Sequence, residues 1–307
     1  MKHYSVLLEE TINGLNINPN GIYVDATLGY GGHSEQILKR IKKGFLFAFD
    51  QDEEAIFYGQ QRLTQVSPNF KIIYANFAEL KERLAEENVT KVDGIIFDLG
   101  LSSPQIDEAG RGFSFQKEAP LDMRMDKNSV LTAKEVVNNY SLEVLVNIFF
   151  TYGEEKFSKN IAKNIIKARA EKPIETTLEL VEIIKSAVPF QYFIKNHPER
   201  PIFQAIRIEV NSELKVLSKA LEDALGLLAP GGRICVITFH SLEDRIVKRM
   251  FKTNSEVNRL VKGLPEIPEA YKPLIKLINN KPILPTKEEL EQNSRSKSAK
   301  LRIIERV

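Results

Sequence analysis

The stretch Asp25-Ala-Thr-Leu-Gly-Tyr-Gly-Gly-His33 decides the fold of this 307-residue chain. It follows a short apolar run, Gly21-Ile-Tyr-Val-Asp25, and opens residues 33–43, where apolar side chains recur at helical spacing. Glycine permits a tight turn and lets the backbone approach a bound ligand closely. A strand, a glycine-rich turn and a helix in this order predict an α/β cofactor-binding unit.

A second acid supports a cofactor that contains ribose. Asp50 ends the next apolar run, about twenty residues after the glycines, where an acid can accept hydrogen bonds from ribose hydroxyls. The turn departs from the GxGxxG spacing of dinucleotide enzymes. The later turn Leu228-Ala-Pro-Gly-Gly-Arg233 leads into an apolar strand, as is typical of class I methyltransferases. A methyltransferase is therefore favoured over a dinucleotide oxidoreductase.

Strand and helix patterns alternate on either side of a purely helical stretch. Strands are expected at 21–25, 45–50, 71–76, 92–98, 233–239 and 299–306. From about 106 to 205 the segments are helical, with a capping box at Thr176 and Glu179 and a loop at Phe190–Pro201. We expect a parallel-sheet domain made of residues 1–105 and 206–307, and an inserted helical domain made of residues 106–205 that recognises the substrate. Asn211 or Ser212 should cap the helix that returns to the sheet.

Composition excludes several classes of site. The single cysteine, Cys235, lies in an apolar run and cannot form an internal disulfide or a cysteine metal cluster. The four histidines show no metal-ligand spacing, so no protein-bound catalytic metal is expected. No apolar run reaches the length of a membrane span, and the N-terminus has no signal-peptide pattern, so a cytoplasmic location is expected.

The charge is unevenly distributed. Residues 245–307 hold 15 basic and 7 acidic side chains, whereas residues 106–209 hold 15 of each. A basic C-terminal fifth fits a contact with a polyanion, and it fits a solvated tail equally well.

A second group of small and polar residues follows the fourth expected strand. Asp98-Leu-Gly-Leu-Ser-Ser-Pro-Gln105 lies where open α/β folds bind their ligands. Its Ser-Pro pair is similar to the S-P-P-Y loop of enzymes that methylate exocyclic amino groups, although Gln105 replaces the second proline.

The chain resembles the bacterial small-subunit ribosomal RNA cytosine-N4-methyltransferases (the RsmH or MraW family). The resemblance runs nearly end to end, and its blocks occur in one order. They are His3–Leu8, Asp25–His33, Asp93–Gln105, Arg111–Ser114, Leu121–Asp126, Tyr152–Lys156, Phe203–Ile208, Ile237–Ile246 and Arg295–Arg302.

This resemblance implies a class I methyltransferase fold, an α/β Rossmann-like arrangement in which a mostly parallel sheet has helices on both faces and carries an inserted helical lobe. It implies S-adenosylmethionine as the cofactor and a decoding-centre cytosine in 16S rRNA as the substrate. The family's cofactor contacts fall on Gly31, Gly32, His33, Asp50, Phe77, Asp98 and Gln105.

Several residues have two alternative roles that the sequence leaves open. The cytosine amino group is a poor nucleophile, so catalysis needs alignment and hydrogen-bond acceptors, which Asp98, Ser102 and Ser103 could supply. Asp98 could instead only anchor the cofactor. His240, after the fifth strand, could hydrogen-bond the base or a phosphate, or could orient Glu243 or Asp244. Phe77 could pack on adenine or in the core.

Four arginines are candidates for phosphate contacts or for structural ion pairs, and the two roles are equally open. They are Arg111, Arg124, Arg207 and Arg295.

The expected partner is the small ribosomal subunit or its RNA, with no membrane and no stable protein partner; the oligomeric state is left open. Two alternatives remain open. The chain could methylate another amino target, in DNA or protein, or it could be a non-catalytic RNA-binding assembly factor.

Overall fold

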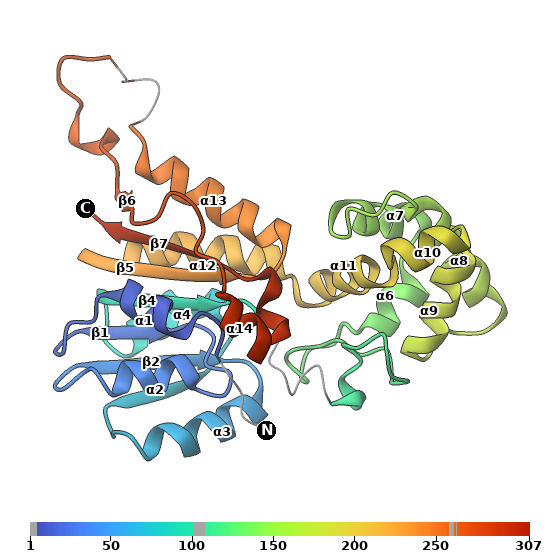
Figure 1. Ribbon diagram of the computed structural model, residues 1–307, viewed down its shortest axis with the longest axis horizontal. Coiled ribbons are helices and arrows are strands. Elements are labelled where there is room, and N and C mark those ends of the chain that lie inside the picture. Colours follow the sequence, from blue (N-terminus) through green and yellow to red (C-terminus); the bar gives the residue numbers. More distant parts are fainter. Residues whose placement is uncertain (1–4, 101–107, 258–260, 262) are drawn as a thin grey trace. The chain divides into compact units, whose positions relative to one another are not determined.

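The computed structural model describes residues 5–100, 108–257, 261 and 263–307. The chain divides into two compact units, each with its own core. Met1–Gly100 and Leu214–Val307 form the sheet unit, and Leu101–Glu213 form the helical lobe (Figure 1). The division thus falls after Gly100 and Glu213 rather than after residues 105 and 205.

The sheet unit contains a seven-stranded sheet of order β3-β2-β1-β4-β5-β7-β6. The first five positions in this order are parallel, and β7 runs antiparallel to both β5 and β6. This is the predicted class I methyltransferase fold, with every expected strand present and one short strand, β6, that the sequence patterns missed. The strands are β1 Ile22–Asp25, β2 Phe45–Asp50, β3 Phe70–Tyr74, β4 Val92–Asp98, β5 Leu228–Thr238, β6 Ile275–Leu277 and β7 Lys300–Arg306.

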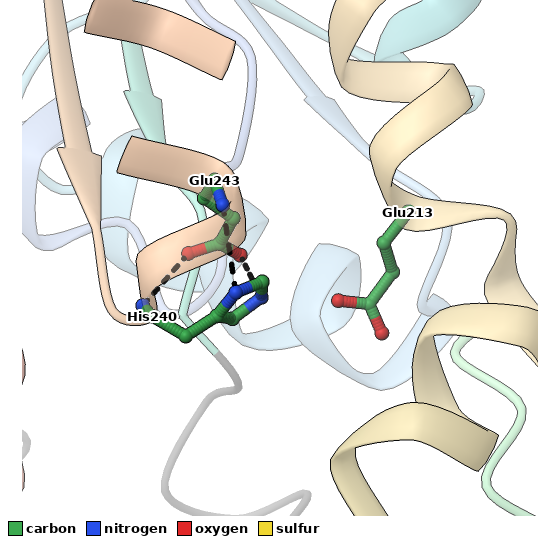
Figure 2. A group of neighbouring side chains, drawn as sticks. All are labelled: Glu213, His240 and Glu243. Atoms are coloured by element: carbon green, nitrogen blue, oxygen red, sulfur yellow. Dashed lines mark hydrogen bonds and ion pairs between the residues drawn. The ribbon is translucent and has the colours of Figure 1, made fainter. Parts of the chain in front are cut away.

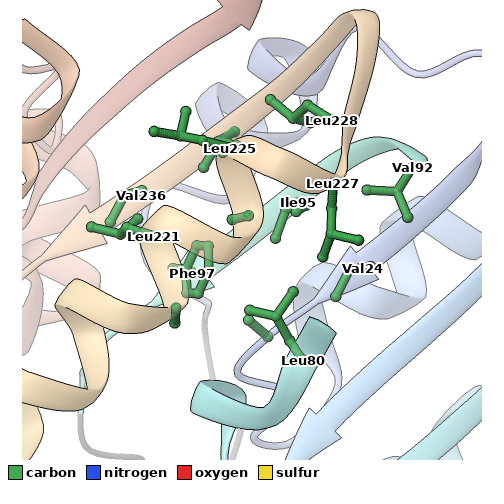
Figure 3. Close-up of a cluster of buried hydrophobic side chains, with 14 of the residues drawn as sticks. Val24, Leu80, Val92, Ile95, Phe97, Leu221, Leu225, Leu227, Leu228 and Val236 are labelled. Atoms are coloured by element: carbon green, nitrogen blue, oxygen red, sulfur yellow. The ribbon is translucent and has the colours of Figure 1, made fainter. Parts of the chain in front are cut away.

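Helices cover both faces of this sheet, because alternate residues of each strand point to opposite sides. Ile95 and Phe97 of β4 pack in one core with Leu221 (Figure 3), whereas Ile96 packs in the other core with Ile37. The first core includes residues of α4 Leu80–Glu86, α12 Glu213–Leu227 and α13 Ser241–Ser255; the second includes residues of α1 Leu8–Leu15, α2 Gly32–Leu38 and α3 Glu53–Thr64. The unit also contains α14 Lys287–Gln292 and the 3-10 turns η1 Phe77–Glu79, η3 Glu269–Tyr271 and η4 Ser294–Ser298.

The helical lobe packs around a separate apolar core. Its predicted capping box is confirmed: Thr176 accepts from the N–H of Glu179, and the Glu179 carboxylate accepts from the N–H of Thr176. Its elements are η2 Ala109–Arg111, α6 Ala133–Asn139, α7 Leu142–Thr151, α8 Ser158–Glu171, α9 Thr177–Ser186, α10 Phe190–Asn196 and α11 Glu199–Asn211.

Two local predictions are wrong. The expected loop at Phe190–Pro201 contains α10 and the start of α11, because its prolines precede or open helices instead of interrupting them. Asn211 does not cap α12: its side chain accepts from the N–H of Met125 and donates to the carbonyl of Met123. Ser212 has a left-handed backbone (φ 50°) and ends α11.

Among the described residues, no helix combines the length and the apolar character that crossing a membrane requires. Cys235 is fully buried in β5, as its apolar neighbours predicted.

Candidate active site

Three acids end three neighbouring parallel strands at the same edge of the sheet. Asp25 closes β1, Asp50 closes β2 and Asp98 closes β4. Strand β5 runs parallel to β4 and ends at Thr238, two residues before His240. Asp50 and Asp98, which the sequence assigned to the cofactor and catalytic sites, therefore lie together at the carboxyl edge of the sheet.

The glycine-rich turn joins β1 to α2 at this edge. Gly29 and Gly31 have positive φ angles of 49° and 75°, which strain any residue with a Cβ atom. Gly32 is the first residue of α2, and a Cβ atom there would overlap Oγ of Ser5. The predicted tight turn is thus confirmed, and Ser5 of the N-terminal segment lies close to Gly32.

Asp50 is held by the backbone around it. Its Oδ2 accepts from the N–H of Gly29 (2.8 Å between N and O) and its Oδ1 from the N–H of Asp52 (2.9 Å). Burial raises the pKa of Asp50 to about 6, and the two backbone N–H groups oppose that rise. Each carboxylate oxygen has a second lone pair, so Asp50 can still accept hydrogen bonds from ribose hydroxyls.

Asp98 is partly buried and has one acceptor atom without a described partner. Its backbone N–H donates to Oγ1 of Thr27 (2.7 Å), which fixes the end of β4 against the glycine-rich turn. Its Oδ1 is buried and has no hydrogen-bond partner among the described residues. Burial is the largest cause that raises the pKa of Asp98 to about 7, and the negative charges of Asp25 and Glu243 add to it. A buried acceptor without a partner costs free energy, which a ligand with a donor or a positive charge would recover.

His33 lies in the first turn of α2, next to Asp98. Its Nδ1 is 3.7 Å from Oδ2 of Asp98, and its side chain is almost fully buried. The structure thus brings together two of the residues that the sequence assigned to the cofactor.

Asp25 is a participant that the sequence reasoning did not assign to the site. It is buried, and it accepts from Oγ of Ser34 (2.7 Å) and from the N–H of Thr27 (3.1 Å). Burial raises its pKa. Its signal was visible, because it is the acid that closes the first strand immediately before the glycines. Its role here is to tie the turn to α2.

Phe77 opens the turn η1 after β3. Its ring packs edge-on against Phe97 with 5.8 Å between ring centroids, and it is only partly buried. The core contact that the sequence left open is therefore present, and the exposed part of the ring can still pack on a ligand.

His240 is the N-cap residue of α13 and forms a capping box with Glu243 (Figure 2). Nδ1 of His240 accepts from the N–H of Glu243 (3.5 Å), and its Nε2 lies 3.0 Å from Oε1 of the same residue. The Glu243 carboxylate in turn accepts from the N–H groups of Phe239 and His240. This geometry favours the reading in which His240 orients Glu243.

Ser102, Ser103 and Gln105 lie outside the described residues.

Three of the four candidate arginines make structural contacts within the helical lobe. Arg111 is buried and donates to the carbonyls of Arg124 and Met125. Arg124 forms a bidentate pair with Asp122, and Arg207 forms one with Glu213. These three arginines therefore have structural roles, because their N–H groups bind carboxylates and carbonyls inside the lobe.

The residues of the sheet edge fit an adenosine-containing cofactor with a positive charge. Asp50 offers acceptors for ribose, Gly31 offers backbone without a side chain, and Oδ1 of Asp98 offers a buried acceptor that lacks a partner among the described residues. S-adenosylmethionine has a group that suits each of them: ribose hydroxyls for Asp50, a methionine chain that can lie against the glycine backbone, and cationic groups for Asp98.

Comparison with known proteins agrees with this reading. The chain matches the model of the MraW methylase family over residues 1–307. It is 55% identical over 307 residues to the ribosomal RNA small subunit methyltransferase H of Exiguobacterium sibiricum, an alignment that covers 100% of this chain and 98% of that protein.

Solved structures with similar folds are more distant in sequence. An rRNA methylase from Streptococcus thermophilus aligns with 100% of this chain and 99% of its own, at 12% identity and a TM-score of 0.45. TrmN from Thermus thermophilus aligns with 98% of this chain and 48% of its own, at 11% identity and a TM-score of 0.44.

Proposed function

Because this chain belongs to the MraW methylase family, we propose that it transfers a methyl group from S-adenosylmethionine to the N4 amino group of a cytosine in the decoding centre of 16S rRNA. The observation that carries this proposal is the buried Oδ1 of Asp98, which has no described partner and lies at the edge that also presents Asp50 and the glycine-rich turn. The relative from Exiguobacterium sibiricum is named a small-subunit rRNA methyltransferase, which fits the proposed substrate. That substrate places the activity in the cytoplasm.

The cofactor is proposed to be held by residues at the carboxyl edge of the sheet. Asp50 accepts from the ribose, and the backbone of Gly31 and Gly32 lies along the ligand. When bound, S-adenosylmethionine supplies a methyl group on a positively charged sulfur. The remaining proposed contacts come from His33, Phe77, Asp98 and Gln105.

Asp98 is proposed as the group that makes the cytosine amino nitrogen reactive. The lone pair of N4 is delocalised into the ring, and an acceptor that pulls on an N–H bond localises that lone pair. The nitrogen must lose one proton as it gains the methyl group. With a pKa of about 7, the Asp98 carboxylate can hold that proton near neutral pH and then release it to solvent. Ser102 and Ser103 are proposed as further acceptors.

His240 is proposed to hydrogen-bond the base or a phosphate from the same edge. Its capping of α13 is a competing structural role. His240→Asn separates the two roles, because asparagine is also a good N-cap residue and lacks the ring. Unchanged methyl transfer by this variant would leave His240 with the capping role alone.

The direct test uses methyl-labelled S-adenosylmethionine with small ribosomal subunits and with protein-free 16S rRNA, followed by digestion and identification of the labelled nucleoside. Label in N4-methylcytidine is the expected result. Label in another nucleoside, in DNA or in protein would contradict the proposed target. No label with any substrate, from protein that binds the cofactor, would support an assembly factor.

A further inference from the structure

Helix α8 (Ser158–Glu171) has one buried face and one strongly basic face. Ile161, Ala162 and Ile165 are fully buried in the core of the helical lobe. Three lysines on the exposed side, here called the lysine face, are Lys159, Lys163 and Lys167. Because the buried face anchors the helix, the lysine stems start from fixed positions.

The three lysines are evenly spaced. They follow one another at intervals of four residues, so successive side chains start about 6 Å apart along the helix axis and are rotated by about 40°. They therefore form one row on one side of the helix. This interval is close to the separation of successive phosphates along a nucleic acid strand.

The lysine face has no carboxylate partner among the residues that the structure describes. Other lysines of the same lobe are paired: Lys134 with Glu175 (2.6 Å), Lys172 with Glu179 (2.9 Å) and Lys185 with Glu182 (3.2 Å). The lobe thus has equal numbers of acidic and basic side chains, but these charges are unevenly distributed. Some lysines are paired with carboxylates, whereas the three lysines of the lysine face form a row of positive charge.

Two further basic residues, Lys156 and Arg169, lie near the lysine face but are not part of it. The Lys156 ammonium lies 4.4 Å from the ring centroid of Tyr192 and 5.2 Å from that of Phe157, a cation–π arrangement that holds an exposed lysine just before α8. Arg169 has a different use, because its Nη1 donates to the carbonyl of Val137 (2.8 Å). The lysine face therefore does not include Arg169, which breaks the four-residue spacing and binds a backbone carbonyl of the lobe.

We propose that the lysine face binds consecutive phosphates of one strand of the ribosomal RNA substrate. This inference rests on the proposed function for the identity of the polyanion. The row matches a regularly spaced line of negative charge, which a folded RNA presents along each strand. The face recognises backbone position and shape, and sequence is not read by it.

The same face does not fit a membrane surface. A basic helix that lies on lipid carries large apolar side chains beside its charges. No residue of α8 is among the exposed large hydrophobic residues of the described chain, and between the lysines lie Asn160 and Asn164. An acidic lipid surface is therefore not the partner we infer.

The test compares two triple variants of the full-length protein that remove the same charge from the same lobe. K159Q/K163Q/K167Q removes the lysine face, and K134Q/K172Q/K185Q removes three paired lysines, whose exposed ion pairs contribute little to stability. Binding to protein-free 16S rRNA is measured at several salt concentrations. The slope of log affinity against log salt should become shallower by about two units for the first variant, and by less than half a unit for the control. K159R/K163R/K167R should keep the original slope.

Equal slopes for the two glutamine variants would overturn the proposal. So would a loss of binding seen with assembled small subunits but not with protein-free RNA, because the partner would then be a ribosomal protein. Failure of the proposed function would be seen differently, as missing N4-methylcytidine with wild-type protein. The RNA-binding slopes do not depend on that reaction, so the two failures are distinguishable.

Discussion

The two units place their important charges in opposite environments. In the sheet unit, Asp25, Asp50 and Asp98 end neighbouring strands, and burial raises the pKa of each. In the helical lobe, Lys159, Lys163 and Lys167 are exposed and have no described carboxylate partner. Buried charges respond strongly to protonation and weakly to salt, whereas exposed charges respond strongly to salt. The two kinds of site should therefore be separable by pH and ionic strength.

The largest expected effect is on the chemical step. Asp98→Asn keeps the size of the side chain but removes the carboxylate that we propose as the proton acceptor. Methyl transfer at saturating cofactor should fall by about 100-fold or more. Single-turnover transfer to small subunits measures this. A variant that keeps activity within tenfold of wild type would show that Asp98 does not act on the amino group.

The next effect concerns cofactor affinity. Asp50→Ala removes a carboxylate that holds the turn at Gly29 and that we propose accepts from the ribose. Hydrogen bonds to charged groups contribute about 1.5–3 kcal/mol each, so affinity should fall by roughly tenfold or more. Calorimetric titration of S-adenosylmethionine into the folded variant checks this. Unchanged affinity would mean that the ribose is held elsewhere.

A third prediction uses the sign of the pKa shifts. The folded-state pKa values of Asp50 and Asp98, about 6 and about 7, lie above the unfolded value of about 3.9. The folded state therefore binds more protons between about pH 4 and pH 7. The stability due to these groups is complete below that range and is lost as pH rises through it. Asp98→Asn should raise stability at pH 8 by up to about 4 kcal/mol, a few degrees in Tm.

Asp122 in the helical lobe should show the opposite dependence of stability on pH. Arg124 holds the pKa of Asp122 below its usual range, although partial burial opposes the shift. The stability due to Asp122 is therefore present at neutral pH and is lost on acidification. Asp122→Asn should lower Tm at pH 8 where Asp98→Asn raises it. Thermal unfolding without ligand gives both values, and shifts of the same sign would contradict the assigned environments.

The smallest effect is expected at the basic C-terminal segment. Its positive charge is partly used within the sheet unit: Arg302 and Lys300 face Asp244, and Lys276 pairs with Glu305. Neutralising Arg295, Lys297 and Lys300 together should change the salt slope of RNA binding by about one unit or less, compared with about two units for the lysine face. A larger change than at the lysine face would make the C-terminal segment the main phosphate contact.

The sheet unit was largely predictable because its signals are local. A glycine-rich turn after an apolar run, and acids at strand ends, are readable in sequence. The strand β6 was missed because three residues carry too little pattern. Partners such as Thr27 for the Asp98 N–H depend on which strands are neighbours, and a single sequence does not state that directly.

The helical lobe was less predictable than the sheet unit. An equal count of acids and bases between residues 106 and 209 does not tell which of these charges are paired. Pairing is a three-dimensional property: Lys134 pairs with Glu175 from a distant part of the chain, whereas the lysine face has no carboxylate partner in the part of the chain that the structure describes. The same holds for Arg124, whose binding to Asp122 removed it from the candidates for phosphate contact. The lysine spacing in α8 was visible in the sequence but could not be separated from a solvated helix face.

The central claim is that the sheet unit holds the cofactor and the helical lobe holds RNA phosphates. It is tested most directly by measuring two affinities, for S-adenosylmethionine and for protein-free 16S rRNA, in two variants. Asp50→Ala should weaken cofactor binding by roughly tenfold or more and leave RNA binding within about threefold. K159Q/K163Q/K167Q should weaken RNA binding by roughly tenfold or more at moderate salt and leave cofactor binding within about threefold. Parallel losses of both affinities in either folded variant would contradict the claim.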